Sequence, residues 1–489
     1  MEAVRMKQKA VLFLFVCLGL GALAELSFLH GRIGLSYLVF MTGFYLIFFL
    51  RFRLSYNHRR IGLLFMLAIW ILAGSYLFYD NVLFYNLNLF ILPLLVLFHI
   101  VLVTAPNKLK WAMPSFMKIL WEKLEAGIKY SFQFCAGLFE SLFKNVNIQL
   151  AQTLKRILVG LGIGIPLLLV ITGLLMSADA VFQEIVLRLP QIILELNFLE
   201  GAFRFLVVIV LGLLFFGLFQ VLQVRIKPKE NFRPATRTEW SWDSITAVTT
   251  LIMLNTVYVL FAVIQFRYFF GNDLQNGFTY AEYARRGFFE LMLVTMINWS
   301  LIMSCLKFVH AGSKGFKTTL KMMYSLLIVV SGIMLISAYQ RLSMYEAAFG
   351  FTIDRILAHS FMIFLLVIFA YTLIKVWIEK LTLMHFYVIA GLIFYIALNA
   401  INIEQIIVDN NMERFEETGE MDIYYLNSLS YTGVDGLMEL YKVEPDYPEL
   451  RRLLQQRQQQ VMNEPEISWQ SYNFTRQEVT EKIKDLDLK

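Results

Sequence analysis

Long apolar runs recur through most of this chain, and each is about long enough to cross a lipid bilayer. A helix needs about 20 predominantly apolar residues to span the hydrocarbon core, because each residue advances it by about 1.5 Å. We expect eleven such helices, and the pattern predicts an all-α, polytopic transmembrane helix bundle. The expected spans are 10–29, 33–50, 61–79, 84–104, 156–177, 203–224, 245–268, 289–308, 320–340, 358–376 and 384–401.

Composition supports the same class and excludes others. Of the 489 residues, 58% are hydrophobic and only 16% are charged, which a soluble protein could not keep in solution but a bilayer can accept. The basic residues lie in loops between spans, which does not favour nucleic-acid binding. The three cysteines, Cys17, Cys135 and Cys305, are too far apart in the sequence to predict a metal site, so we expect neither a metal nor a cofactor.

The loops differ in basic residues in an alternating way. If the N-terminus is cytoplasmic, the inner loops are rich in Lys and Arg, and the outer loops contain arginines but no lysine. The positive-inside rule therefore predicts a multi-pass protein of the cell membrane with a cytoplasmic N-terminus. With eleven spans, the C-terminus is extracytoplasmic.

The order of these segments predicts four parts. They are a four-helix membrane part over 1–104, a cytoplasmic amphipathic insert over 105–155, a seven-helix main membrane domain over 156–401, and an acidic helical region over 402–489. In the insert, aromatic and apolar residues alternate with lysines. This pattern is typical of a helix in the lipid headgroup layer, and equally of a linker helix packed against the bundle.

The C-terminal region is polar but has apolar residues to bury. From Ile401 onwards it contains 9 Lys and Arg against 18 Asp and Glu, together with tyrosines and leucines at helical spacing. We expect a small helical cap outside the membrane, formed after the last span.

The polar stretch Gln265–Glu290 separates two apolar spans. Thr279 and Glu282 match a capping box, and Glu282, Arg286 and Glu290 follow at helical spacing, so a capped helix start explains much of the pattern. Capping does not explain Arg267 or Arg285. Guanidinium groups bind carboxylate and phosphate groups in bidentate fashion, which favours an anion, a lipid headgroup or a sugar as ligand.

A second polar cluster surrounds a predicted turn. Gly350 is typical of a helix C-cap and Thr352 of an N-cap, with Asp354 favourable in the first helical turn. Amides also occur in and beside the spans, where they either join helices through hydrogen bonds or line a hydrated cavity. Together these segments predict an outward-facing site under the C-terminal cap. Its residues are Arg267, Glu282, Arg285, Arg286, Glu290, Arg341, Tyr345, Asp354, Arg355 and Asn399.

The middle of each expected span lacks Asp, Glu, Lys and Arg, which disfavours an ion-coupled carrier. We expect a non-catalytic sensor, scaffold or uptake component that has the bilayer around it and binds an anionic or lipid-derived ligand from outside. The alternative is a membrane enzyme that acts on a lipid-linked envelope precursor, with Glu282, Glu346 and Asp354 as its possible acids and bases.

Four stretches resemble the DUF4173 family of uncharacterised bacterial multi-pass membrane proteins, which is related to DUF4153. They read NTVYVLFAVIQFRYFF, TYAEYARRGFFEL, MYEAAFGFTIDRI, and NAINIEQ with the later NMERF and MDIYYLNSLS. The resemblance covers roughly residues 245–435. It implies a bacterial cell-membrane protein and supplies no activity, cofactor or partner.

Overall fold

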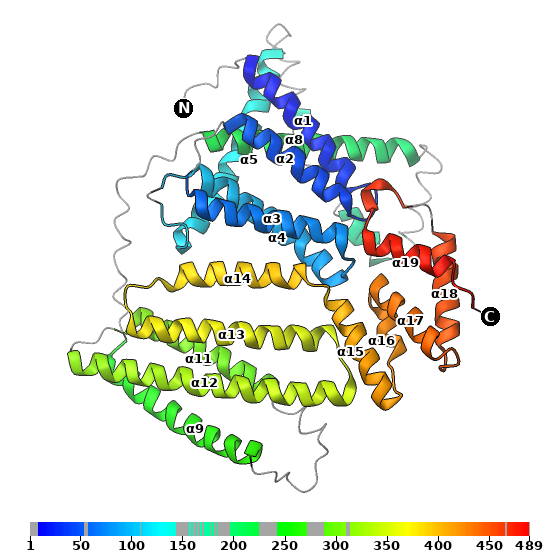
Figure 1. Ribbon diagram of the computed structural model, residues 1–489. Helices are drawn as coiled ribbons and strands as arrows, with labels where there is room; N and C mark the ends of the chain where they lie inside the picture. Colours follow the sequence, from blue (N-terminus) through cyan, green and yellow to red (C-terminus); the bar gives the residue numbers. More distant parts are fainter. Residues whose placement is uncertain are drawn as a thin grey trace. The chain divides into compact units, whose positions relative to one another are not determined.

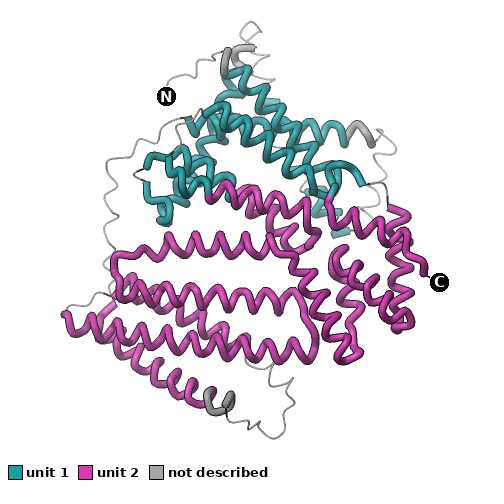
Figure 2. The backbone as a smooth tube through the Cα atoms, viewed as in Figure 1, with its two compact units in different colours: residues 1–63, 95–226, 467–472 teal, residues 64–94, 227–466, 473–489 magenta. Residues whose placement is uncertain are grey.

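The computed structural model describes most of the chain, and its regular structure there is helical. The described residues are 8–52, 57–107, 109–142, 196–223, 242–270, 288–309, 313–464 and 467–488, with short pieces between 156 and 182. The chain divides into two compact units, coloured separately in Figure 2. Unit 1 comprises residues 1–63, 95–226 and 467–472, and unit 2 comprises residues 64–94, 227–466 and 473–489.

Unit 1 is a group of apolar helices from the first half of the chain. Helices α3 and α4 are divided, since the start of α3 and the end of α4 belong to unit 1 and the remainder to unit 2. The elements are α1 (Gln8–Phe28), α2 (Leu35–Phe52), α3 (Arg59–Phe78), α4 (Val82–Thr104), α5 (Pro114–Leu142), α8 (Leu196–Gln223) and the 3₁₀ turn η1 (Trp469–Ser471).

Helix α8 lies at the centre of unit 1 because glycines let two other helices approach it closely. A Cβ atom added to Gly21 of α1 would lie 2.4 Å from the carbonyl oxygen of Val208. A Cβ atom added to Gly217 would lie 2.1 Å from the carbonyl oxygen of Gly127 in α5. Inside lipid the hydrophobic effect does not drive helices together. Small residues favour their association because they let the backbones pack densely.

Helix α5 forms most of the insert that follows the first four spans. Ser131 donates a hydrogen bond of 2.6 Å to the carbonyl oxygen of Leu213, and the Lys123 ammonium donates to that of Val221 at 2.9 Å. The helix therefore packs against α8, which agrees with the interpretation of the insert as a linker helix packed against the bundle. Trp121 and Phe132 remain exposed, which leaves the insert an apolar side directed away from α8.

Unit 2 contains the remaining long helices and the C-terminal region. Its elements beyond α3 and α4 are α9 (Ser244–Phe270), α11 (Phe288–Phe308), α12 (Lys314–Phe349), α13 (Ile353–Trp377), α14 (Leu383–Ala400), α15 (Ile403–Thr418), α16 (Ile423–Ser428), α17 (Tyr431–Val443), α18 (Leu450–Asn463) and α19 (Phe474–Lys484).

Helix α12 is the packing partner of three neighbours in unit 2. It lies beside α13 in Figure 1, and its buried leucines form one apolar core with residues of α9, α11 and α13. Polar side chains add hydrogen bonds within this core. Asn255 of α9 donates to the carbonyl oxygen of Met323 at 3.1 Å, and Asn298 of α11 donates to Ser331 Oγ at 2.9 Å. These amides therefore join helices, as amides inside spans commonly do.

The C-terminal region folds as the expected small helical cap. Helices α15 to α19, which we call the cap, enclose a second apolar core that includes Leu426, Leu437 and Leu454. Phe84, at the start of α4, is buried in the same core.

Ten helices in the described residues are long and apolar enough to cross a membrane. They coincide with ten of the expected spans and confirm an all-α, multi-pass membrane protein. The expected span over 156–177 lies partly outside the described residues and is not among these ten. The side of the membrane on which each terminus lies stays a prediction.

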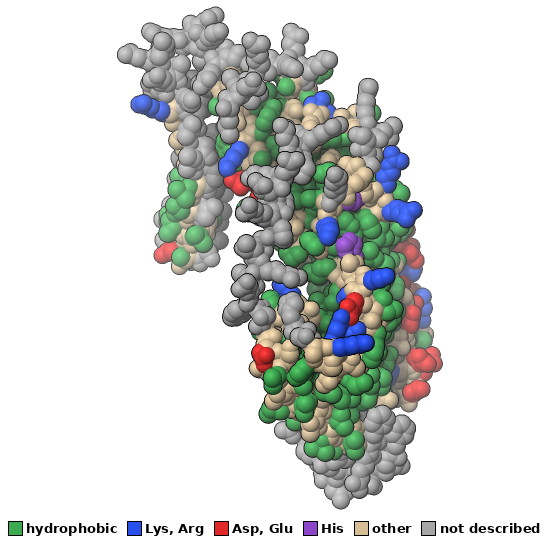
Figure 3. Space-filling view, turned by 90° about the vertical axis from the view of Figure 1, so that its left-hand side faces the viewer, with side chains coloured by type: hydrophobic (Ala, Val, Ile, Leu, Met, Phe, Trp, Pro, Cys, Tyr) green, Lys and Arg blue, Asp and Glu red, His purple; other side chains and the backbone are tan. Residues whose placement is uncertain are grey.

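The end of unit 2 at which α12 begins is basic. Lys317 and Lys321 contact the Glu379 carboxylate at 2.8 and 2.9 Å, and hydrogen bonds from these two lysines lower the pKa of Glu379 to about 2. Figure 3 shows Lys and Arg side chains among apolar ones at this end of the molecule. The arrangement is typical of a cytoplasmic membrane boundary.

The close approach of α5 and α8 can be tested at Gly217. We expect Gly217→Ala to lower the thermal unfolding temperature of the purified protein in detergent, since the added methyl group forces the helices apart and overpacking costs about 1–3 kcal/mol. Gly201→Ala in the same helix is the matched control. No atom of the described residues lies within 4 Å of a Cβ at Gly201, and alanine favours helix, so its temperature should be unchanged or higher. Equal behaviour of the two variants would contradict the packing role.

Candidate functional site

The turn between α12 and α13 carries the largest group of polar residues that the sequence predicted to be functional. Here Gln265, near the end of α9, is close to two residues of α12. Its Oε1 atom accepts hydrogen bonds from Ser337 Oγ at 3.0 Å and from an Arg341 guanidinium nitrogen at 3.1 Å. All three side chains are buried. The structure thus brings Arg341 beside the segment that leads into the predicted arginine-rich loop.

A buried contact between a carboxyl group and an imidazole lies near the same turn. Glu346 Oε2 is 2.8 Å from His359 Nε2, with side-chain exposures of 5% and 12%, and the Tyr339 ring meets the imidazole edge-on at 4.2 Å. Among the described residues, Glu346 Oε1 and both ring nitrogens of His359 are buried without a hydrogen-bond partner. Sequence reasoning missed His359, because its partner is 13 positions earlier and only the turn joins them.

The C-terminus of α12 ends at a glycine that adopts positive φ. Gly350 has φ of 81° and its N–H donates to the carbonyl oxygen of Glu346 at 2.7 Å, so the predicted C-cap is confirmed. Arg355 donates to the carbonyl oxygen of Gly350, and its guanidinium carbon lies 4.4 Å from the centre of the Tyr345 ring. Thr352 occupies the predicted N-cap position, but its side chain makes no capping hydrogen bond.

The cap holds this turn through its own polar side chains. Asn411 of α15 both accepts from the N–H of Phe351 at 2.8 Å and donates to its carbonyl oxygen at 3.0 Å. Arg414 donates to the carbonyl oxygen of Ala348 at 3.0 Å. Tyr425 Oη of α16 accepts from the N–H of Ile353 at 2.8 Å. We call Asn411, Arg414 and Tyr425 the clamp.

Other predicted site residues lie apart from these contacts. Glu290 and Asp354 are exposed in the first turns of α11 and α13. Arg267 belongs to α9, but its side chain lies outside the described residues, as do Glu282, Arg285 and Arg286 entirely. For these residues the predicted site stays a prediction.

Asn399 belongs to a different polar network, where α14 meets α4. Its Oδ1 accepts from Asn88 Nδ2 at 2.7 Å, and Tyr395 donates to Asn88 Oδ1 at 2.7 Å. Asn88 also donates to Ser75 of α3 at 3.2 Å. The network satisfies buried amides between helices, so Asn399 has a structural role here and does not join Arg341 or Arg355 in one site.

Beside this network lies Glu404, a buried carboxyl group at the start of the cap. Its Oε1 accepts from Asn81 Nδ2 at 2.9 Å, and its Oε2 accepts from Ser430 Oγ. Burial, with the nearby Asp80 carboxylate as a smaller cause, raises the pKa of Glu404 from 4.5 to about 7, even though both hydrogen bonds lower it. Glu404 thus titrates near neutral pH while it joins the cap to the α3–α4 loop.

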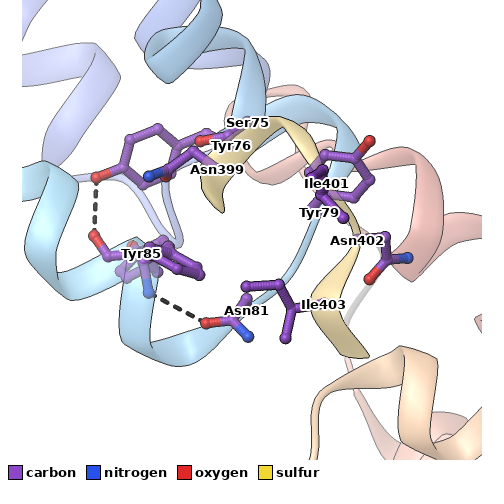
Figure 4. Close-up of a pocket in the computed structure, with 10 residues that line it drawn as sticks. Ser75, Tyr76, Tyr79, Asn81, Tyr85, Asn399, Ile401, Asn402 and Ile403 are labelled. Atoms are coloured by element: carbon purple, nitrogen blue, oxygen red, sulfur yellow. Dashed lines mark hydrogen bonds between the residues drawn. The ribbon is translucent and has the colours of Figure 1, made fainter. Parts of the chain in front are cut away.

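A small cavity adjoins these residues, as Figure 4 shows. It is lined by side chains that include Tyr76, Asn81, Tyr85, Asn399 and Asn402, and Tyr76 donates to the carbonyl oxygen of Tyr85 at 2.8 Å across it. Its volume of about 20 Å³ is enough for roughly one water molecule. The cavity can hold a water molecule beside the contact between the cap and the α3–α4 loop, but it is too small for a lipid headgroup.

Nearby, the cap is also hydrogen-bonded to the end of α3. Asn473, at the N-cap of α19, donates to the carbonyl oxygens of Tyr76 at 2.9 Å and Tyr79 at 3.1 Å. Thr475 donates to that of Phe78 at 2.7 Å. The last turn of α3 therefore finds its missing hydrogen-bond donors in the cap.

Stability should depend on pH through Glu404. Because its pKa is higher in the folded than in the unfolded protein, the folded state binds more protons between pH 4.5 and 7, and stability falls as pH rises through this window. Glu404→Gln removes that loss, roughly 3 kcal/mol at most. Its unfolding temperature in detergent should exceed that of the wild type at pH 8 and match it more closely at pH 4.5.

Glu413→Gln is the control for this prediction, since Glu413 is an exposed carboxyl group of the same helix. It should behave as the wild type at both pH values. A Glu404→Gln variant with an unchanged pH dependence would show that Glu404 is not the responsible group.

Comparison with known proteins places this architecture in one family. Neither the curated proteins nor the solved structures contain a match to the chain. The model of a family described as a domain of unknown function, DUF4153, matches residues 66–440, which is most of the chain. The expected label DUF4173 differs slightly from this but names a related family. The protein is an integral membrane protein, and it belongs to the DUF4153 family.

Proposed function

We propose that this protein is a non-catalytic sensor or scaffold of the bacterial cell envelope, and that it binds an anionic or lipid-derived ligand at the cap end of unit 2. The observation that carries the proposal is the clamp. Asn411, Arg414 and Tyr425 connect an extramembrane helical region directly to the backbone where two membrane helices meet. An event at this turn therefore alters the cap and the spans together.

The arginines of this end support an anionic ligand. Arg355 lies at the turn, and Arg341 lies within α12, nine residues before Gly350. Gln265, which Arg341 contacts, is two residues before Arg267 and precedes the predicted Arg285 and Arg286 in the sequence. Guanidinium groups recognise phosphate and carboxylate through paired hydrogen bonds. Tyr345, against which Arg355 stacks, adds an apolar surface for the neighbouring part of a lipid-derived molecule.

Sensing follows from the hydrogen bonds of the clamp. Arg414 donates to the carbonyl oxygens of Ala347 at 3.3 Å and Ala348 at 3.0 Å, and Arg355 donates to that of Gly350 in the same turn. A bound anion competes for these cations, so it must weaken their hold on α12. The cap then changes its position or its stability, and a partner protein in the envelope can detect the change.

Ligand binding can be measured as a rise in unfolding temperature. Short-chain phosphatidic acid should stabilise the purified protein, by about 2.7 kcal/mol at 100 times its Kd, whereas diacylglycerol with the same chains should not. Arg285→Ala should abolish this stabilisation and leave the amount of protein in the membrane intact. Arg451→Ala, which removes an exposed arginine of α18, should retain it.

Two results would contradict the proposal. One is equal stabilisation by phosphatidic acid and diacylglycerol, which would show that the anionic group is not recognised. The other is loss of protein from the membrane with Arg285→Ala, which would assign that arginine to the capping of a helix.

The buried pair of Glu346 and His359 favours a second function, that of a membrane enzyme acting on a lipid-linked envelope precursor. A carboxylate that contacts an imidazole is a common acid–base arrangement, and each group here has an atom without a partner. Asp354, in the first turn of α13, lies near this end, and Glu282 is a further carboxylate that the sequence predicted for such an enzyme.

Isosteric amides separate the two functions. If the protein is a sensor, phosphatidic acid should still stabilise Glu346→Gln. In that case neither the wild type nor any variant should convert a polyprenyl-linked sugar supplied in membranes. For the enzyme, the wild type should convert that precursor, and Glu346→Gln should do so at least 100-fold more slowly, as loss of a general acid or base predicts at about 10²–10⁴-fold. Asp354→Asn and Glu282→Gln test the remaining carboxylates in the same assay.

A further inference from the structure

A large groove lies between α9 and α11, at the end of unit 2 where α9 begins and α11 finishes. Its volume is about 490 Å³, within the range of about 300–1,000 Å³ that is usual for ligand sites. Trp242 contributes from just before α9, the first turns of α9 contribute Thr246, Thr250 and Leu251, and α11 contributes Leu301 and Cys305. The groove is thus formed by two membrane-spanning helices.

The threonine hydroxyls that line the groove and one oxygen of Asp243 already have hydrogen bonds. Thr250 Oγ1 donates to the carbonyl oxygen of Thr246 at 2.9 Å, and Thr246 Oγ1 donates to Asp243 Oδ2 at 3.3 Å. The same Asp243 oxygen accepts from the N–H groups of Ile245 and Thr246 at 3.0 Å, so the carboxylate caps the N-terminus of α9. What the groove offers a ligand is therefore chiefly apolar surface.

Aromatic and basic residues surround its mouth. The N–H of Trp242 donates to the carbonyl oxygen of Phe308 at 3.1 Å, and the two rings lie 6.1 Å apart. The exposed Lys307 ammonium lies 4.9 Å from the centre of the Phe308 ring. Tryptophan and lysine together at the end of a span are typical of the headgroup layer, where a lysine attracts anionic lipids.

We propose that this groove binds one acyl chain of an anionic phospholipid, whose headgroup lies at Lys307. The charge of Lys307 selects the headgroup, and the accessible apolar surface of Trp242 and Leu301 holds the chain. Ile245, beside the groove, is 62% exposed, so this side of α9 meets the bilayer that supplies the lipid. The site is separate from the proposed ligand site, because Ser244, the first residue of α9, and Gln265 are about 32 Å apart along the helix.

Thr250 and Thr249 provide a matched pair for the test. Both are exposed, both donate their hydroxyl groups to carbonyl oxygens of the preceding turn, and only Thr250 lines the groove. In the full-length protein with Cys17, Cys135 and Cys305 replaced by alanine, Thr250→Cys and Thr249→Cys are each labelled with N-ethylmaleimide in detergent. The labelling rates are compared without lipid, with phosphatidylglycerol and with phosphatidylcholine.

Phosphatidylglycerol at about ten times its Kd should slow the labelling of Thr250→Cys about tenfold and that of Thr249→Cys little, because occupancy follows mass action. Phosphatidylcholine should protect less, and Lys307→Gln should remove the difference between the two lipids. Leu301→Trp, which fills the groove, should abolish protection by lipid. Arg285→Ala should leave the protection intact, which separates this site from the proposed sensor site.

Equal protection of the two cysteines would overturn the proposal, since it would mean that lipid covers the whole helix without entering the groove. Equal protection by both lipids would overturn the role of Lys307. If Leu301→Trp prevents folding, native mass spectrometry decides: retention of phosphatidylglycerol by the wild type but not by Lys307→Gln supports the site, and equal retention refutes it.

Discussion

The last carbonyl groups of α12 cannot find donors within their own helix, and the arrangement of the cap end depends on the residues that satisfy them. The Gly350 N–H closes the helix, and the guanidinium groups of Arg355 and Arg414 reach the carbonyl oxygens beside it. Cations at a helix C-terminus are also favoured by the helix dipole. One of these cations belongs to α13 and the other to the cap, so both elements are positioned by the same helix end.

This constraint explains why distant parts of the sequence meet. The stretch MYEAAFGFTIDRI supplies the turn, while NMERF and MDIYYLNSLS supply Asn411, Arg414 and Tyr425 of the clamp. A similar solution recurs at the end of α3, where Asn473 and Thr475 donate to carbonyl oxygens. The cap therefore has its own apolar core and also supplies hydrogen-bond donors to the ends of helices in unit 2.

Hydropathy predicted the membrane helices well, because the bilayer imposes a strict requirement on length and polarity. The expected span 384–401 and the observed α14, Leu383–Ala400, differ by one residue at each end. Helix α12 runs to Phe349 instead of 340, since its last turns are held by hydrogen bonds that hydropathy does not detect. His359 and Glu404 were missed because their partners come from distant parts of the sequence. Hydropathy also could not predict that Asn399 would contact Asn88, since these two residues belong to different helices.

The length of α12 has a mechanical consequence. Its 36 residues extend over about 54 Å, whereas the hydrocarbon core of a bilayer measures about 30 Å, so one continuous helix reaches beyond the membrane. A hydrogen-bonded helix is stiff, so it tilts as one rigid body. A tilt imposed where Arg414 contacts its C-terminus is transmitted to Lys317 and Lys321, and through Glu379 to the loop after α13 on the opposite surface. A tilt of α12 as one rigid body would therefore displace both of its ends without refolding any segment.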